Sequence, residues 1–445
     1  MHVDTVINAR WIIPIVPKNC LLENHSLVVD EGIIIDILPT EQAGKYQAKK
    51  THYLTDHLIT AGFINAHTHA AMNLLRGIAD DLPLHEWLEE HIWPAEAEMA
   101  TADFVHDGTL LAIAEMLRGG TTCFNDMYFF PDQIALAVKQ VGIRATIGLP
   151  VIDFPTRWAS NIDEYLTKAL AVRDQYQGDP LISFSFAPHA PYTVSDSSFA
   201  RCQPIFDELG ICTHMHVHET SQEIEDSHKA HDTRPLNRLK DLQLLGPNFI
   251  AVHMTELNDE EIELLTTYGV HVVHCPESNL KLASGFCPVD KLIKAGVNVA
   301  LGTDGAASNN DLDMIGEMKT AALLAKSING KADTLPAYSV LEMATINGAK
   351  ALGLENKIGS LEIGKQADII AINLNQLETQ PVYDPVSTLI YSASRSQVTD
   401  VWVNGTQQLK GGQLTQMNIK ELINKATDWQ QKLAHFHHKQ CKIDS

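Results

Sequence analysis

The chain has 445 residues, of which 45% are hydrophobic and 20% are charged, and its formal net charge is −22 at pH 7. This composition is typical of a globular protein and excludes an intrinsically disordered chain. The acidic balance argues against nucleic acid as a partner, because no surplus of basic residues is available to neutralise phosphates. The length predicts one large barrel with a smaller domain beside it.

Seven cysteines are scattered along the chain, and no pair has the C-x-x-C spacing. They predict reduced thiols in a cytoplasmic protein. The segment Met1 to Asp4 lacks the charged region and apolar core of a signal peptide. No apolar stretch approaches the ~20 residues that cross a bilayer, so we expect no membrane partner.

Residues 1–57 have the alternation of short β-strands. Val3 to Val16 and Leu27 to Leu38 are rich in Val and Ile, and Asp30-Glu31-Gly32 is typical of a hairpin turn. We expect this segment to form the N-terminal part of a small β-domain.

Between residues 58 and 358, short apolar strands alternate with helical stretches such as Asp103–Arg118 and Ile162–Gln177. Eight strands with helices between them predict an α/β fold, a (β/α)₈ TIM-type barrel that carries the catalytic site. The eight strands are expected at Leu58–Ala66, Thr121–Asp126, Ala145–Ile152, Ile182–Ala187, Ile211–His216, Phe249–His253, Val270–His274 and Val297–Gly302.

Residues 359–445 return to strand patterns at Ala367–Leu374, Val398–Asn404 and Thr406–Leu414, and a polar amphipathic helix is expected from Asn418. We expect the two ends of the chain to build one small β-sandwich, with the terminal helix added to it. The tail residues His435, His437, His438 and Cys441 resemble a metal cluster in composition, but their polar surroundings favour a solvated helix end.

A series of polar residues follows the predicted barrel strands. His-x-His pairs occur four times among 21 histidines, whereas chance gives about one, so the spacing alone is weak. Residues two apart share one face of a strand, and barrel active sites lie at the carboxyl ends of the strands. The series at or just after these ends is His67, His69, His189, His216, Glu219, His253 and Asp304.

Three histidines and an aspartate are a suitable ligand set for catalytic zinc. His67, His69 and Asp304 supply three of the four ligands. The fourth comes from the run that contains His214, His216 and His218, in which neighbours on one face are ~7 Å apart, so that only one can bind the ion. Periodicity does not select among the three. We choose His216, because Glu219 then lies just beyond the strand.

Zinc lowers the pKa of bound water from 15.7 to roughly 7, which supplies a nucleophile at neutral pH. Asp304 or His253 could take the proton from that water, and Glu219 could protonate the group under attack. The residues therefore predict metal-assisted hydrolysis at an sp² carbon that bears a leaving group. Deaminases with paired cysteine ligands are excluded, because those cysteines are missing.

Other polar and aromatic residues have simpler interpretations. His274 is expected to be a buried polar residue. Glu96, together with the acidic residues around it, is most simply part of a solvated helix face, and Trp87 and Trp93 are most simply packing residues.

The segment Ala61 to His69 resembles the metal-binding opening of the amidohydrolase superfamily. The segment Leu74 to Glu96 is similar to the 5'-methylthioadenosine/S-adenosylhomocysteine deaminase branch, which is related to triazine and guanine hydrolases. Further matching segments are Pro188–Tyr192, His216–Thr220, Ser278–Gly285, Gly302–Ser308 and Gly359–Asp368.

This resemblance implies specific roles along the chain. It implies that the zinc ligands are His67, His69, His216 and Asp304. It implies that Glu219 shuttles the proton to the purine ring.

The same resemblance implies that His253 orients the attacking water and that His189 contacts the substrate. It implies that Glu96 holds the ribose hydroxyls and that Trp87 lines the pocket. Arg157 is a candidate for contact with the substrate tail.

The implied reaction is hydrolytic deamination of the adenine ring of 5'-methylthioadenosine and S-adenosylhomocysteine, with adenosine as a weaker substrate. Guanine, an aminopyrimidine or a triazine is the alternative substrate, and a non-catalytic metal-binding barrel is the alternative outside enzymes. One zinc ion per subunit is expected, with Fe²⁺ and Mn²⁺ as alternatives for the same ligands. A cytoplasmic homo-oligomer is expected.

Overall fold

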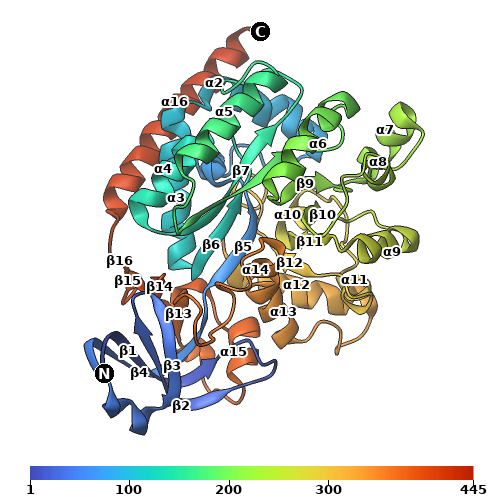
Figure 1. Ribbon diagram of the computed structural model, residues 1–445. Helices are drawn as coiled ribbons and strands as arrows, with labels where there is room; N and C mark the ends of the chain where they lie inside the picture. Colours follow the sequence, from blue (N-terminus) through green and yellow to red (C-terminus); the bar gives the residue numbers. More distant parts are fainter. Residues whose placement is uncertain (444–445) are drawn as a thin grey trace.

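The computed structural model describes the backbone of residues 1–443 and the side chains of residues 1–435. His435 is exposed, whereas the side chains of His437, His438 and Cys441 lie outside the described residues. Two sheets of eight strands each dominate the molecule (Figure 1). Their strand orders are β12-β11-β10-β9-β8-β7-β6-β5 and β16-β15-β14-β13-β4-β1-β2-β3.

The first sheet is parallel and confirms the predicted barrel. Each strand pairs with the next one along the chain. The N–H of Asp304 donates to the carbonyl of His67 (3.0 Å), which brings the end of the last strand to the first. The strands are β5 (Phe63–Thr68), β6 (Thr121–Asp126), β7 (Arg144–Val151), β8 (Ile182–Pro188), β9 (Thr213–Val217), β10 (Phe249–His253), β11 (His271–His274) and β12 (Val299–Leu301).

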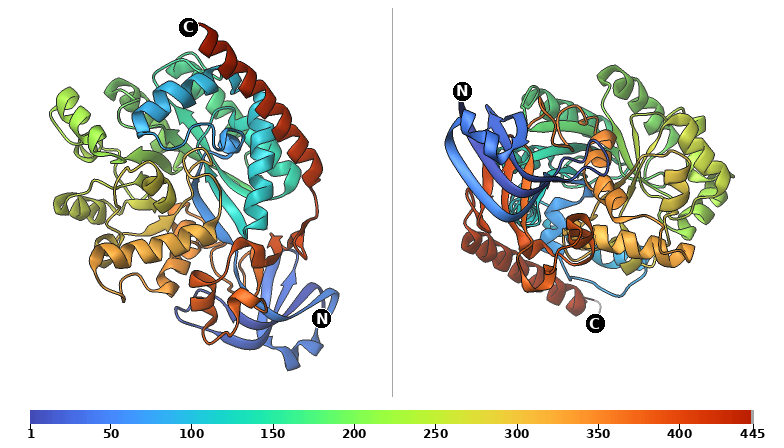
Figure 2. Two further views of the ribbon diagram at one scale, coloured as in Figure 1. Left: turned by 180° about the vertical axis from the view of Figure 1, so that it is seen from behind. Right: turned by 90° about the horizontal axis from the view of Figure 1, so that it is seen from below.

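Helices cover the outside of the barrel, as the two views of Figure 2 show. A π-helix (Trp87–Ile92) lies between α1 and α2, and short 3₁₀ turns lie at Thr40–Lys45, Ala70–Leu75, Leu377–Thr379 and Arg395–Gln397. The α-helices are α1 (Leu84–Glu86), α2 (Trp93–Met99), α3 (Ala102–Arg118), α4 (Pro131–Val141), α5 (Ile162–Gln175), α6 (Asp196–Leu209), α7 (Ser221–His231), α8 (Pro235–Asp241), α9 (Asp259–Tyr268), α10 (Pro276–Lys281), α11 (Val289–Lys294), α12 (Met314–Asn329), α13 (Ala337–Met343), α14 (Ile346–Ala351), α15 (Pro385–Tyr391) and α16 (Ile419–Ile443).

The second sheet joins the two ends of the chain, as predicted. Its central strand β4 pairs in parallel with β1 and antiparallel with β13. Glu31 and Gly32 both have positive φ (49° and 78°), which is the geometry of the predicted hairpin turn. The strands are β1 (His2–Ile13), β2 (Leu22–Asp30), β3 (Ile33–Pro39), β4 (Gln47–Ala61), β13 (Ile369–Asn373), β14 (Val398–Val403), β15 (Thr406–Lys410) and β16 (Gln413–Leu414).

The predicted strand Leu58–Ala66 is in fact two strands in different sheets. β4 ends at Ala61 in the small sheet, and β5 begins at Phe63 in the barrel. Gly62 lies between them, and a Cβ atom there would meet the Thr122 side chain at 2.1 Å. The apolar run hid this break because both strands are buried at this point.

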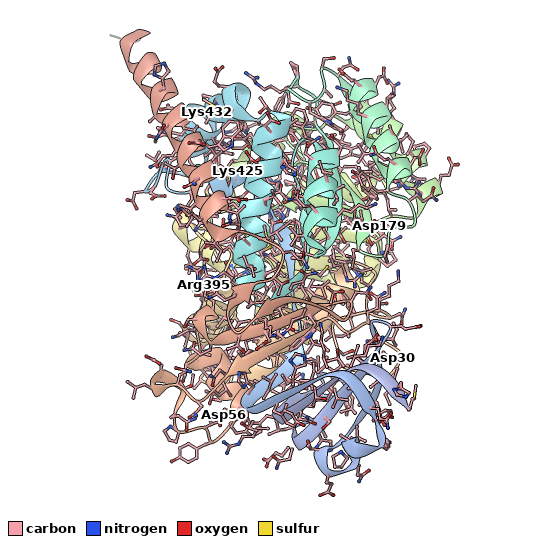
Figure 3. The ribbon with its side chains drawn as sticks, turned by 90° about the vertical axis from the view of Figure 1, so that its left-hand side faces the viewer. Asp30, Asp56, Asp179, Arg395, Lys425 and Lys432 are labelled. Carbon is pink, nitrogen blue, oxygen red and sulfur yellow. The ribbon has the colours of Figure 1, made fainter. Side chains whose placement is uncertain are left out.

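The C-terminal helix α16 packs along α3 (Figure 3). Lys425 forms an ion pair with Asp107 (2.5 Å), and the indole N–H of Trp429 donates to the same carboxylate (3.0 Å). Lys432 lies over the Trp429 ring. Within residues 1–443, no helix is long and apolar enough to cross a membrane.

Candidate active site

Four ligand-type atoms converge at the carboxyl ends of β5, β9 and β12. The Nε2 atom of His216 lies 3.3 Å from Nε2 of His67 and 3.2 Å from Nε2 of His69. Oδ1 of Asp304 lies 3.2 Å and 3.3 Å from the same two nitrogens. These separations match the edge of a zinc tetrahedron, about 3.3 Å for bonds of 2.0–2.1 Å.

The hydrogen bonds of the other ring nitrogens decide which atoms carry lone pairs. Nδ1–H of His69 donates to the carbonyl of Met127 (2.6 Å), and Nδ1–H of His216 donates to the carbonyl of His189 (2.7 Å). Both Nε2 atoms are therefore unprotonated in the neutral rings. Lone pairs that converge on one another and on a carboxylate repel unless a cation lies between them, so the donor set fits zinc.

The run His214-x-His216-x-His218 divides its three imidazoles among three places. Only His216 reaches the ligand cluster. Nε2 of His214 lies 2.9 Å from Nδ1 of His67, on the side away from the cluster, and accepts the hydrogen bond that orients that ring. The His218 ring is buried and accepts the N–H of Leu236 (3.1 Å).

The carboxylate of Asp304 is held on both oxygens. Ser278 and Ser308 donate their hydroxyls to Oδ2 (2.6 and 2.9 Å), and the N–H of Gly305 donates to Oδ1 (2.8 Å). Burial alone would raise the pKa of Asp304, but positive charge on the neighbouring rings of His67 and His69, which a bound cation would supply in its place, holds it well below its usual range. Asp304 is therefore ionised at neutral pH, as a metal ligand must be.

Glu219 and His253 face each other beside the ligand cluster, with 3.8 Å between Oε2 and Nε2. Burial raises the pKa of Glu219. Nδ1–H of His253 donates to Oδ1 of Asn279 (2.9 Å), which leaves Nε2 as a proton acceptor. Left-handed backbone occurs at His218, His253 and Asp304 (φ 55°, 76° and 64°), and such strain clusters at functional sites.

A cavity of about 380 Å³ opens above these residues. Its lining includes the predicted residues His189, Trp87, Glu96 and Arg157. Nδ1 of His189 forms a hydrogen bond with the Thr193 hydroxyl (3.1 Å). Burial lowers the pKa of His189 to about 3, so the ring is neutral. The cavity walls also contain aromatic side chains that the sequence did not assign to the site: Trp93, Tyr128, Phe129 and Phe154.

Glu96 belongs to the cavity and not to a solvated helix face, which corrects the simpler interpretation made from the sequence. Burial raises the pKa of Glu96 to about 7, and Tyr128 acts in the opposite direction. Trp93 is also more than a packing residue, since its ring lies 6.0 Å from that of Phe154 in the cavity wall. Trp87, the first residue of the π-helix, is buried and lines the same cavity.

Arg157 lies at the mouth of the cavity, 41% exposed at its side chain. Its Nε–H donates to the carbonyl of Ala97 (2.5 Å), and the guanidinium lies 3.6 Å from Glu98. His274 lies elsewhere: it is buried at the end of β11 beside a smaller cavity, and its Nδ1 has no partner among the described side chains.

Several residues of the site have no signal of their own in the sequence, so they were not predicted individually. Ser278, Asn279 and Ser308 lie in segments that resemble the family, but no periodicity indicates that they support Asp304 and His253. Tyr128 follows β6 without any motif of its own. Their roles depend on contacts between segments that are far apart in the sequence.

Residues 58–407 match the amidohydrolase family. The 5-methylthioadenosine/S-adenosylhomocysteine deaminase of Teredinibacter turnerae is 51% identical over 432 residues, which cover 97% of this chain and 98% of that protein. The crystal structure of an adenosine deaminase from Xanthomonas campestris with bound zinc has a TM-score of 0.96 and 50% identity, covering 98% of this chain and 99% of that one. An atrazine chlorohydrolase of Arthrobacter aurescens complexed with zinc shares the fold, with a TM-score of 0.90 at 21% identity over 96% of this chain and 99% of that one.

Proposed function

Because this chain belongs to the amidohydrolase family, we propose that it is a zinc-dependent deaminase of 5'-methylthioadenosine and S-adenosylhomocysteine. The products are 5'-methylthioinosine, S-inosylhomocysteine and ammonia. One observation carries the proposal: three imidazole nitrogens and an ionised carboxylate converge at the floor of a cavity, beside a buried glutamate.

His67, His69, His216 and Asp304 would hold zinc, which would supply a bound water with a pKa lowered to about 7. His253 orients that water through Nε2, because its Nδ1–H is engaged by Asn279. Asp304 accepts the proton of the water on its carboxylate. Glu219 then moves a proton to the ring nitrogen next to C6, a task suited to a carboxyl whose pKa is raised by burial.

The remaining roles concern the nucleoside. The carboxylate of Glu96 accepts hydrogen bonds from the ribose 2'- and 3'-hydroxyls, and Trp87 packs against the substrate. His189, as a neutral ring, contacts the purine. Arg157 lies where a charged 5' tail would leave the cavity, and its guanidinium suits a carboxylate.

Two names among the relatives bear on the 5' substituent. The relative from Teredinibacter turnerae is named for the thio-nucleosides, whereas the zinc-bound structure from Xanthomonas campestris is named an adenosine deaminase. The apolar rings of Trp93 and Phe154 in the cavity wall favour a thioether over a bare hydroxyl. We therefore assign the thio-nucleosides as substrates and adenosine as a weaker one.

The organisation of the chain belongs to the same proposal. The sequence predicts the first boundary between residues 57 and 58, but β4 stays in the small sheet to Ala61. We therefore assign residues 1–61 and 359–445 to the small β-domain and the terminal helix, and residues 63–358 to the catalytic barrel. The enzyme works in the cytoplasm as a homo-oligomer. Among the described residues the six cysteines are all free thiols, which suits a reducing compartment.

The test is an assay of zinc-replete protein with each thio-nucleoside and with adenosine. Release of ammonia together with the adenine-to-hypoxanthine absorbance change is expected. A protein inert toward every adenosine derivative but active on guanine, an aminopyrimidine or a triazine would replace the substrate assignment. A zinc-loaded protein inert toward all of these amines would indicate a non-catalytic barrel.

Glu96 separates nucleosides from free bases. A free base has no ribose hydroxyls, so Glu96→Gln should reduce turnover of a nucleoside far more than turnover of adenine. Equal losses on both would remove Glu96 from the ribose site.

A further inference from the structure

The dipeptide His218-Glu219 leaves β9 in a strained turn. His218 has φ 55°, a left-handed conformation that is strained for a residue with a Cβ atom. The turn carries the side chain of Glu219 into the cavity. Such a backbone persists only where surrounding contacts hold it.

The carboxylate of Glu223, in the first turn of α7, holds this dipeptide on one side. The N–H of His218 donates to Oε1 (3.0 Å), and the N–H of Glu219 donates to Oε2 (2.7 Å). Both bonds are buried, and so is the Glu223 side chain. Burial raises the pKa of Glu223 to about 8, while the two N–H groups act in the opposite direction, so both contacts favour the ionised carboxylate as their acceptor.

Thr255, just beyond β10, holds the same dipeptide on its other side. The N–H of Thr255 donates to the carbonyl of His218 (2.9 Å), and its hydroxyl lies 2.8 Å from the carbonyl of Glu219. All four backbone polar groups of the dipeptide are therefore engaged, two of them by one carboxylate.

Helix capping does not explain the place of Glu223. Its sequence context, Thr220-x-x-Glu223, is that of a capping box, in which the glutamate returns to the N-cap N–H. At α9 this happens: Glu261 accepts the N–H of the N-cap residue Asn258 (3.0 Å). At α7 the Thr220 hydroxyl accepts the N–H of Glu223 (3.3 Å), but the carboxylate reaches past the N-cap to the two residues before it.

We propose that Glu223 is a positioning residue that fixes Glu219 for proton transfer, by binding both N–H groups of the strained turn that carries it. This inference rests on the proposed role of Glu219 as the proton shuttle. Glu223 does not line the cavity and does not belong to the ligand cluster, so its effect passes through Glu219.

Glu223→Gln tests the proposal, because it keeps the shape of the side chain and replaces one acceptor oxygen with an NH₂ group that faces an N–H. We expect kcat to fall about 10- to 100-fold, with KM and zinc content close to those of the wild type. Glu164→Gln is the matched control: this glutamate also accepts a backbone N–H at a helix start, from Ser160 (2.8 Å), but on the surface of α5. It should leave kcat unchanged.

A double-mutant cycle separates positioning from a general loss of structure. If Glu223 acts through Glu219, the variant E219Q/E223Q has the same residual activity as E219Q. Losses that multiply would overturn the proposal, as would a wild-type kcat for E223Q. Should E223Q fail to fold, Thr255→Val removes the hydroxyl on the opposite side of the dipeptide, and T255V replaces E223Q in the double-mutant cycle with E219Q.

Crystal structures of the variants distinguish this inference from the proposed function. In E223Q the Glu219 carboxylate should be displaced from its place 3.8 Å from His253. If the wild type deaminates no adenosine derivative, the proposed function fails, and the displacement still decides whether Glu223 places Glu219. If the wild type is active and the E223Q crystal shows Glu219 unmoved, the inference fails alone.

Discussion

The two ends of the barrel are built on opposite principles. At the carboxyl ends, imidazole lone pairs converge on one another and three strand ends adopt left-handed backbone. At the amino ends, Arg144, the first residue of β7, donates two hydrogen bonds to Asp368 (2.9 and 3.1 Å) and a third to the carbonyl of Pro180 (2.9 Å). Asp368 also accepts the N–H of Asn404 (2.8 Å).

The polar groups at the two ends have different partners. The buried charges at the amino ends satisfy each other and fasten the barrel to the small sheet. The buried polar groups at the carboxyl ends gain their full set of partners only when a cation and a substrate bind. We therefore expect substitutions at one end to change activity and substitutions at the other to change stability.

The largest effect is expected from His67→Ala, which removes one member of the ligand cluster. Zinc and activity should be lost together, with kcat/KM reduced by more than about 10⁴-fold, because the water is no longer activated. Metal analysis and the ammonia assay measure the two losses. His271→Ala, at the amino end of β11, is the matched control and should keep both; an active H67A protein would contradict the site.

Glu219→Gln should lower kcat about 10²- to 10⁴-fold while zinc is retained, because only proton transfer is removed. The thermal stability of this variant should not fall. Burial raises the pKa of Glu219, so its ionised form destabilises the fold at neutral pH, and a neutral amide relieves that cost. Thermal unfolding should show an unchanged or higher midpoint; a large drop would place Glu219 among the structural residues.

Asp368→Asn should act on stability alone. It leaves the Arg144 guanidinium buried and uncompensated, which costs about 3–5 kcal/mol of unfolding free energy. Urea unfolding measures the loss, while kcat at low temperature stays that of the wild type. Lys291→Met, which breaks the exposed pair with Asp259, should have no measurable effect. A loss of zinc in D368N would contradict the assignment of stability to the amino ends and activity to the carboxyl ends.

The smallest effect is a pH dependence that only the carboxyl end should show. Burial raises the pKa of Glu96 to about 7, so its carboxylate is ionised above that pH and becomes neutral below it. A neutral carboxyl holds the ribose hydroxyls less well, so KM for a nucleoside should rise about tenfold as the pH falls from about 8 to about 6. In Glu96→Gln this rise should disappear, and its persistence would assign the titration to another group.

The barrel and the joining of both chain ends into one sheet were predictable, because strand alternation and strand–helix order depend on local sequence. The structure also brings together His67, His69, His216 and Asp304, whose places at strand ends the sequence already indicated. Periodicity could not choose among His214 and His216 in β9 and His218 just beyond it. That choice depends on the depth of each ring in the barrel, which no single strand specifies.

Other features could not be predicted from the sequence, because they depend on contacts between segments that are far apart along the chain. The break at Gly62 is invisible in an apolar run, since both strands are buried there. The reach of Glu223 past its own N-cap depends on the turn before α7, and the same motif at Asn258-x-x-Glu261 behaves in the ordinary way. The capping-box motif does not specify the direction of its carboxylate.

The junction at Gly62 also sets a limit for protein engineering. Only four residues lie between this glycine and His67, and Gly62 is the single residue between β4 and β5. A chimera that grafts this barrel onto a foreign β-domain must therefore keep the crossing beside Thr122 intact, or the graft will shift the first metal-facing side chain together with the strand that bears it.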